Sequence, residues 1–459
     1  LSANGAFTAK NVTLEGGRTL EFGRNTNVAL TLAGGTLALQ NNISASNVTV
    51  TADSSVEVAE NATGHLSRDV AMADGAVLAK TGAGALALDS TTTGGKYRVQ
   101  EGTLALNGTY ANIESVAIAN NAKLALANGS SVTTAISVDG AGVIQGAATG
   151  TATLAGTVSG TGTLTLADRT TVNSAISGSL GVNVTGNTVI GGAAANTYTG
   201  GTTISGATVT ANKAESFGSG VVTLSDSATL TAGTNITMGA LAGGADSTLN
   251  ANNRTITLSG VAGTTTYAGA VSGISLVKNG EGVQAFTDVQ SLNSVTVNGG
   301  GLTLTGTAVT VKGAVTVAEA ATLTLSGGFT FASAISNSGT VVFYGATISL
   351  SQSDFSADRT YTIVSGGTAS GISLANIYID GDLADSDSVT LSTIDGNLML
   401  TYMAARDLVW NGAGVTDLWN GNNVWLNGEA GVTFMPGDNV SFTNDAASKT
   451  VMIAKLTET

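Results

Sequence analysis

The stretches Asn11-Val12-Thr13-Leu14, Leu30-Thr31-Leu32 and Val48-Thr49-Val50 place the same apolar-x-apolar pair at a fixed interval of 18 residues. Alternation with a period of two is typical of a strand with one buried face. The interval is too short for a strand followed by a crossover helix. It fits one turn of a coil built from short strands, whose apolar positions stack from turn to turn.

The spacing continues along the chain. Leu86/Leu88 precede Leu104/Leu106 by 18 residues, whereas Val116/Ile118 and Ile136/Val138, like Val295/Val297 and Val315/Val317, are 20 apart. Second strands fall between the first three pairs at Leu20-Glu21-Phe22, Leu37-Ala38-Leu39 and Val56-Glu57-Val58. We therefore predict an all-β chain whose residues 1–405 form a right-handed parallel β-helix, a β-solenoid with Leu14, Leu32 and Val50 in one core. Rungs of about 18–21 residues would give roughly 20 turns.

Composition limits the classes of function. The 459 residues include 62 Gly and 1 Pro, and a hydrophobic content of 42% with a mean hydropathy of +0.27 argues against disorder. Only 10% of residues are charged and the net charge is −14, so the basic stripe that nucleic-acid binding needs is absent. The excess of acidic residues also disfavours anionic lipid surfaces and fits a self-repelling, soluble surface.

The chain contains no cysteine, so its stability does not depend on disulfides. No window of about 18 apolar residues predicts a membrane-spanning helix. The sequence begins at Leu1 and is already inside the strand pattern at Val12. We interpret it as an internal fragment of a longer protein.

Three Gly-rich segments repeat a motif within this pattern. The first is Lys80-Thr81-Gly82-Ala83-Gly84-Ala85-Leu86-Ala87-Leu88, and the second is Asn196-Thr197-Tyr198-Thr199-Gly200-Gly201-Thr202-Thr203. The third runs from Leu276 through Lys278-Asn279-Gly280-Glu281-Gly282 and departs from the others, because Val283-Gln284-Ala285-Phe286 stands where Leu-x-Leu is usual. Together the segments resemble the autotransporter-associated β-strand repeat of passenger domains in Gram-negative surface proteins.

This resemblance covers most of residues 1–405 and implies a function. It implies a pectin-lyase-like or pertactin-like β-helix that is surface-exposed or secreted and is associated with the outer membrane. It also implies that a membrane β-barrel lies elsewhere in the full-length chain, beyond Thr459. The expected role is an adhesin or a structural stalk scaffold, with a host-surface protein or a glycan as its partner.

The motif residues also have a mechanical interpretation. Gly200-Gly201 provides a corner that tolerates no Cβ, and Tyr198 covers it. Asn196 is expected to hydrogen-bond to the turns before and after its own, as stacked Asn ladders do. None of these residues needs a catalytic role.

Residues 406–459 differ in composition from the rest. They hold all three tryptophans, Trp410, Trp419 and Trp425, together with the sole proline, Pro436. We predict that regular stacking breaks near Ala404-Ala405-Arg406-Asp407 and that this segment is a cap or the start of a further repeat module. The tryptophans are expected to be buried; a sugar-stacking platform is the alternative.

The candidates for chemistry are few. His65 is the only histidine and is expected in an exposed loop, which leaves a Ser-His-Asp site without support. One His and no Cys nearly exclude zinc. Asp380, Asp382, Asp385 and Asp387 cluster without the spacing of an EF-hand, so the sequence leaves calcium open.

We therefore expect no enzyme, no cofactor, no metal and no catalytic residue. A polysaccharide-active β-helix enzyme, a lyase or a hydrolase, is the alternative, because two carboxylates that are distant in sequence can form a catalytic pair without leaving a local motif. A purely structural array without a ligand is a third class.

Overall fold

The computed structural model describes residues 2–3, 9–90, 93–251, 253–355, 360–386, 389–402, 406–412, 419, 424–432, 434 and 438–451. Ala404, Ala405, Pro436, Asp387 and Thr459, which figure in the predictions above, lie outside these ranges. The protein is 57% strand and 1% helix, and its parallel coils stack as a β-solenoid of about 17 turns. The chain forms two compact units, residues 1–293 with 298–304 and residues 294–297 with 305–459. Each is described by itself.

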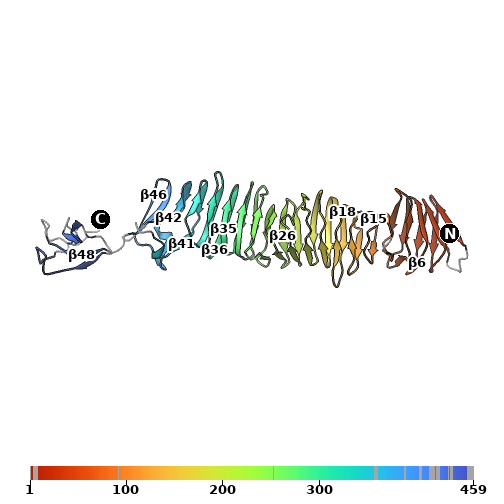
Figure 1. Ribbon diagram of the computed structural model, residues 1–459, viewed down its shortest axis with the longest axis horizontal. Helices are drawn as coiled ribbons and strands as arrows, with labels where there is room; N and C mark the ends of the chain where they lie inside the picture. The colour runs from red at the N-terminus through yellow and green to blue at the C-terminus, as the bar shows by residue number, and fades with distance from the viewer. Residues whose placement is uncertain are drawn as a thin grey trace. The chain divides into compact units, whose positions relative to one another are not determined.

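The first unit repeats short strands that pair in parallel with the strands one coil before and after; β15 and β18, for example, lie side by side (Figure 1). Its main sheet contains β1 (Ser2–Ala3), β3 (Thr19–Phe22), β5 (Thr36–Leu39), β6 (Ile43–Ala45), β8 (Ser54–Val58), β9 (Thr63–Leu66), β11 (Val77–Thr81), β12 (Ala85–Leu88), β13 (Gly95–Val99), β14 (Thr103–Leu106), β15 (Ile113–Ile118), β16 (Lys123–Leu126), β18 (Ala135–Gln145), β20 (Val158–Ala167), β22 (Ser179–Val184), β24 (Thr202–Ser205), β26 (Val221–Ser225), β28 (Ile236–Met238), β29 (Ala240–Gly243), β31 (Thr255–Leu258), β32 (Thr264–Tyr267), β33 (Val271–Lys278) and β34 (Val283–Phe286). β35 (Val289–Val297) and β36 (Gly301–Val311) contribute residues to both units.

Two smaller parallel sheets belong to the same coils. The first contains β2 (Asn11–Glu15), β4 (Ala29–Ala33), β7 (Val48–Ala52) and β10 (Ala71–Met72). The second contains β17 (Ser131–Val132), β19 (Ala152–Leu154), β21 (Thr170–Val172), β23 (Thr188–Ile190), β25 (Thr208–Ala211), β27 (Thr229–Ala232) and β30 (Thr248–Asn250).

The predicted register is confirmed. Leu14 pairs with Leu32, which pairs with Val50, and all three side chains are buried. The second strands are also in register, because Leu20 pairs with Leu37 and Leu37 with Val56. The apolar alternation therefore builds one continuous core, and burial of these stacked side chains is the main stabilising contribution.

The second unit continues the parallel pattern and then departs from it. Its elements are β37 (Val315–Val317), β38 (Thr322–Phe331), β39 (Ile335–Asn337), β40 (Thr340–Phe343), β41 (Thr347–Leu350), β42 (Thr360–Ser365), β43 (Thr368–Ser370), β44 (Ile377–Ile379), β45 (Asp382–Leu383), β46 (Val389–Ile394), β47 (Asn397–Tyr402), β48 (Asp407–Trp410), β49 (Trp425–Asn427), β50 (Ala430–Val432), β51 (Asn439–Ser441) and the short 3-10 helices η1 (Gln352–Asp354) and η2 (Leu374–Asn376).

Most coils keep the expected length, but some are longer. Asn337 reaches Gly366 on the next coil across 29 residues, because β41 and the Ser351-capped η1 are inserted within that turn. The parallel ladder then ends in an antiparallel hairpin, in which β47 pairs with both β42 and β46. Longer turns and this hairpin explain why there are about 17 turns rather than about 20.

The tryptophan-containing segment has a sheet of its own, with the strand order β50-β49-β48-β51. Trp410 and Trp425 are buried in a core with Leu408 and Val424, against which Trp419 packs. Arg406 begins the segment and is joined to Asp438 by two side-chain hydrogen bonds, of 3.0 and 2.6 Å. Burial of Trp410 and Trp425 is thereby confirmed. The strand that pairs with β42 at the end of the parallel ladder is β47, which the sequence analysis did not identify as a cover. A capping role for residues 406–459 stays a prediction.

Candidate functional site

The lysine of the first Gly-rich motif is buried inside the coil. Lys80 is 1% exposed, and its Nζ donates hydrogen bonds to the carbonyl oxygens of Thr81 (2.7 Å), Gly82 (2.6 Å) and Glu101 (3.1 Å). Gly82 has a φ of +72°, and a Cβ there would lie 2.4 Å from the carbonyl oxygen of Val58. Burial lowers the pKa of Lys80 to about 8, against the opposing effect of Glu101 and Glu57.

The third motif repeats this arrangement. Lys278 is buried, and its Nζ donates to the carbonyl oxygens of Asn279, Gly280, Glu281 and Gly299, at 2.7 to 3.2 Å. Burial lowers its pKa as well. In both motifs, the buried lysine ammonium group thus binds several backbone carbonyl oxygens where the chain turns a corner of the coil. The signal that could have revealed this role is the Lys-x-Gly spacing shared by Lys80-Gly82 and Lys278-Gly280.

The second motif ties three coils together. Asn196 accepts a hydrogen bond from the Ile176 N–H (2.9 Å) and donates one to the Ser216 carbonyl (2.7 Å), each 20 residues away. Lys213, also buried, donates to the Asn196 Oδ1 at 3.2 Å. The ladder predicted for Asn196 is therefore confirmed.

The corner beside Asn196 also matches the prediction. Tyr198 is buried and its hydroxyl lies 2.6 Å from the Thr202 Oγ1. A Cβ on Gly200 would lie 2.3 Å from the Leu180 carbonyl oxygen, so close backbone approach requires glycine there. These motif residues hold the coils in place.

The prediction that His65 lies in a loop is wrong. His65 belongs to β9 and points outward from the coil, because its neighbours Gly64 and Leu66 are the buried positions of this strand. Its Nδ1 lies 3.0 Å from the Asp89 Oδ2, and Asp89 also accepts a hydrogen bond from Asn107 at 3.3 Å. A strand that crosses the surface exposes alternate side chains, which is why a polar residue is tolerated here.

The acidic cluster is partly committed to local structure. Asp380 accepts hydrogen bonds from the Ser351 hydroxyl (2.8 Å) and the Gln352 N–H (3.3 Å), so it holds the start of η1. Asp382 and Asp385 border the same shallow hollow as Asp380. Within the described ranges, no group of three or more His, Cys, Asp or Glu side chains is placed to hold a metal ion.

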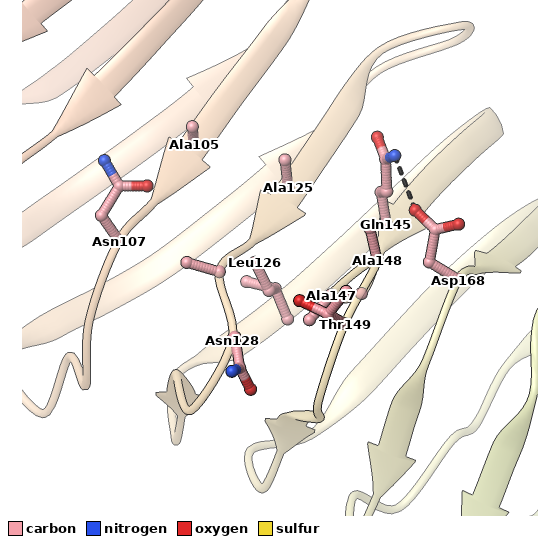
Figure 2. Close-up of a pocket in the computed structure, with 12 residues that line it drawn as sticks. Ala105, Asn107, Ala125, Leu126, Asn128, Gln145, Ala147, Ala148, Thr149 and Asp168 are labelled. Carbon is pink, nitrogen blue, oxygen red and sulfur yellow. Dashed lines mark hydrogen bonds between the residues drawn. The ribbon is translucent and has the colours of Figure 1, made fainter.

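A groove of about 300 Å³ crosses the outer face of the first unit (Figure 2). Its floor contains Ala105 and Ala125, which are paired in register, and Ala125 is in turn paired with Gln145. Outward positions on neighbouring coils thus form a column, and small side chains leave it hollow.

Polar side chains border the groove. Gln145 donates a hydrogen bond to Asp168 (2.7 Å), and Figure 2 shows this pair beyond Ala125, with Asn107 beyond Ala105. Asn128 accepts the Thr151 N–H at 3.1 Å, which fixes the loop that forms a wall. Amides, one carboxylate and alanine methyl groups can bind a hydroxyl-rich molecule. Sequence reasoning missed this groove, because its residues come from four different coils.

No family model, curated protein or solved structure matches the chain. None of the helices in the described part is long and apolar enough to cross a bilayer.

Proposed function

We propose that this β-solenoid is a surface-exposed or secreted autotransporter passenger that acts as an adhesin or as a stalk scaffold. One observation carries the proposal: the residues of the repeat motif serve the stacking of the coils. Lys80 and Lys278 bind backbone carbonyls, and Asn196 links neighbouring coils. Stacked coils of this kind present a repetitive outer surface, which suits adhesion or display.

The proposed partners are a host-surface protein or a glycan, and the proposed location is the bacterial cell surface, associated with the outer membrane. This location follows from the resemblance to autotransporter passengers, and the excess of acidic residues is compatible with an exposed surface, because like charges repel one another.

The location is tested by treating intact Gram-negative cells that express the full-length protein with an external protease. We expect the solenoid to be accessible to antibodies on untreated cells and to be lost after protease treatment, while a periplasmic marker survives. Protection of the solenoid in intact cells, with cleavage only after lysis, would contradict the proposal.

A further inference from the structure

Residues from four successive coils line the groove on the outer face of the first unit. Ala105 pairs with Ala125 and Ala125 with Gln145, and Gln145 donates a hydrogen bond to Asp168 on the following coil, so the groove follows a column of aligned side chains. Successive members of the column are separated by one strand spacing, about 4.8 Å. A chain molecule with a repeat of similar length can therefore contact successive coils.

The groove's lining selects a chemical class. Among the described lining residues, Asp168 is the one ionisable side chain, and none is aromatic or cationic. Phosphate- or carboxylate-bearing ligands need cationic partners, and nucleic acids need them in number, so both are disfavoured. Side-chain amides and a carboxylate, by contrast, accept and donate hydrogen bonds to hydroxyl groups.

A peptide strand is also disfavoured. Addition of a strand to a sheet requires a free edge. β16, which lies under the groove, is already paired with β14 on one side and β18 on the other. The backbone of the floor therefore has no free edge to offer to an extended chain.

We propose that this groove binds a short segment of a neutral oligosaccharide. Gln145, Asp168 and Asn107 take its hydroxyl groups, while the methyl groups of Ala105 and Ala125 contact a C–H face of the sugar. A volume of about 300 Å³ is at the lower end of small-ligand sites, so one or two sugar rings are held. The inference rests on the proposed adhesive function and names the ligand class of that surface.

The test uses the purified chain on an array of neutral and acidic oligosaccharides, with host-matrix proteins printed on the same array. Ala125→Phe fills the groove without touching the core, because Ala125 is half-buried and faces outward. Ala117→Phe is the matched control, since Ala117 is an outward, half-buried alanine of β15 that does not line the groove. Gln145→Ala removes one side-chain amide.

We expect the native chain and Ala117→Phe to bind neutral oligosaccharides equally. Ala125→Phe should lose this binding, and Gln145→Ala should weaken it about tenfold, the effect of one well-placed hydrogen bond. Thermal unfolding checks that each variant is folded. If Ala125→Phe is not folded, the binding of Gln145→Ala to neutral oligosaccharides tests the proposal.

The proposal is overturned if the native chain binds no neutral oligosaccharide, or if the groove variants bind as the native chain does. If the chain still binds host-matrix proteins in that case, the groove proposal is wrong but the adhesive function is supported. Absence of binding to every printed molecule would count against adhesion as well as against the groove.

Discussion

The side-chain amide of Gln284 pairs with both backbone groups of Leu241, which lies 43 residues earlier in the chain. Its Oε1 accepts the Leu241 N–H at 3.0 Å, and its Nε2 donates to the Leu241 carbonyl at 2.8 Å. β32 lies between the two strands and is in register with β29 only at Gly243 and Tyr267. Gln284 thus replaces ladder hydrogen bonds where the backbones do not supply them, and this explains the departure from Leu-x-Leu.

Gln284→Leu should therefore destabilise the protein, although a leucine, Leu86, stands at the corresponding position of the first motif. The change leaves a buried N–H and C=O without partners, at about 1–3 kcal/mol each, which the gain of an apolar side chain only partly offsets. Urea unfolding measures the effect, with the exposed Gln290→Leu as control. Equal unfolding midpoints for the two variants would contradict this role of Gln284.

Lys80→Met should lower stability at pH 7 by about 1–3 kcal/mol, because three partly buried carbonyl groups lose their shared donor. The native protein should also show a pH dependence that the variant lacks. Between pH about 8 and the ordinary lysine pKa of 10.5, the unfolded chain keeps the Lys80 proton and the native chain releases it. Since the unfolded state then binds more protons, stability relative to Lys80→Met should rise with pH across this window.

Denaturant unfolding of both proteins at pH 7, 9 and 10.5 measures that difference. The tyrosines titrate in both proteins, so their contribution cancels when the free energy of unfolding of Lys80→Met is subtracted from that of the native protein. A difference that is constant with pH, or that falls, would show that burial does not disfavour the charged form of Lys80.

Leu86→Asp should destabilise far more than Ala87→Thr. Leu86 is fully buried and stacks on Leu104, so a carboxylate there has no partner and costs more than about 3 kcal/mol. Ala87 faces the opposite side, although it is only 2% exposed because it lies between His65 and Ala105. Ala87→Thr is expected to have a small effect, and similar melting temperatures for the two variants would count against the register.

The register of the core and the corner around Asn196 and Tyr198 were predictable from the sequence, whereas the contacts of the buried Lys278 and Gln284 side chains were not. Leu14, Leu32 and Val50 stack because burial of one strand face imposes a period that the sequence displays. The carbonyl contacts of Lys278 and the Gln284–Leu241 pair depend on how backbones converge in three dimensions. The groove depends on outward positions such as Ala105 and Ala125, where residue choice is too permissive to form a recognisable pattern.

Deletion of residues 406–459 should leave the strand signal of the solenoid unchanged, because β48–β51 form a separate sheet with its own core. Circular dichroism checks this. Binding to neutral oligosaccharides should also survive, since Trp410 and Trp425 are buried and the groove lies in the other unit. Loss of glycan binding by a folded, monodisperse deletion variant would instead favour the tryptophan platform. Increased aggregation would support a capping role for the segment.

The adhesive scaffold is best tested by binding of the purified chain to an array of glycans and host-matrix proteins, with polysaccharide turnover assayed on the same samples. We expect retention on the array without release of any cleavage product. Turnover of a polysaccharide that a single Asp or Glu substitution abolishes would contradict the scaffold role and establish the enzymatic alternative.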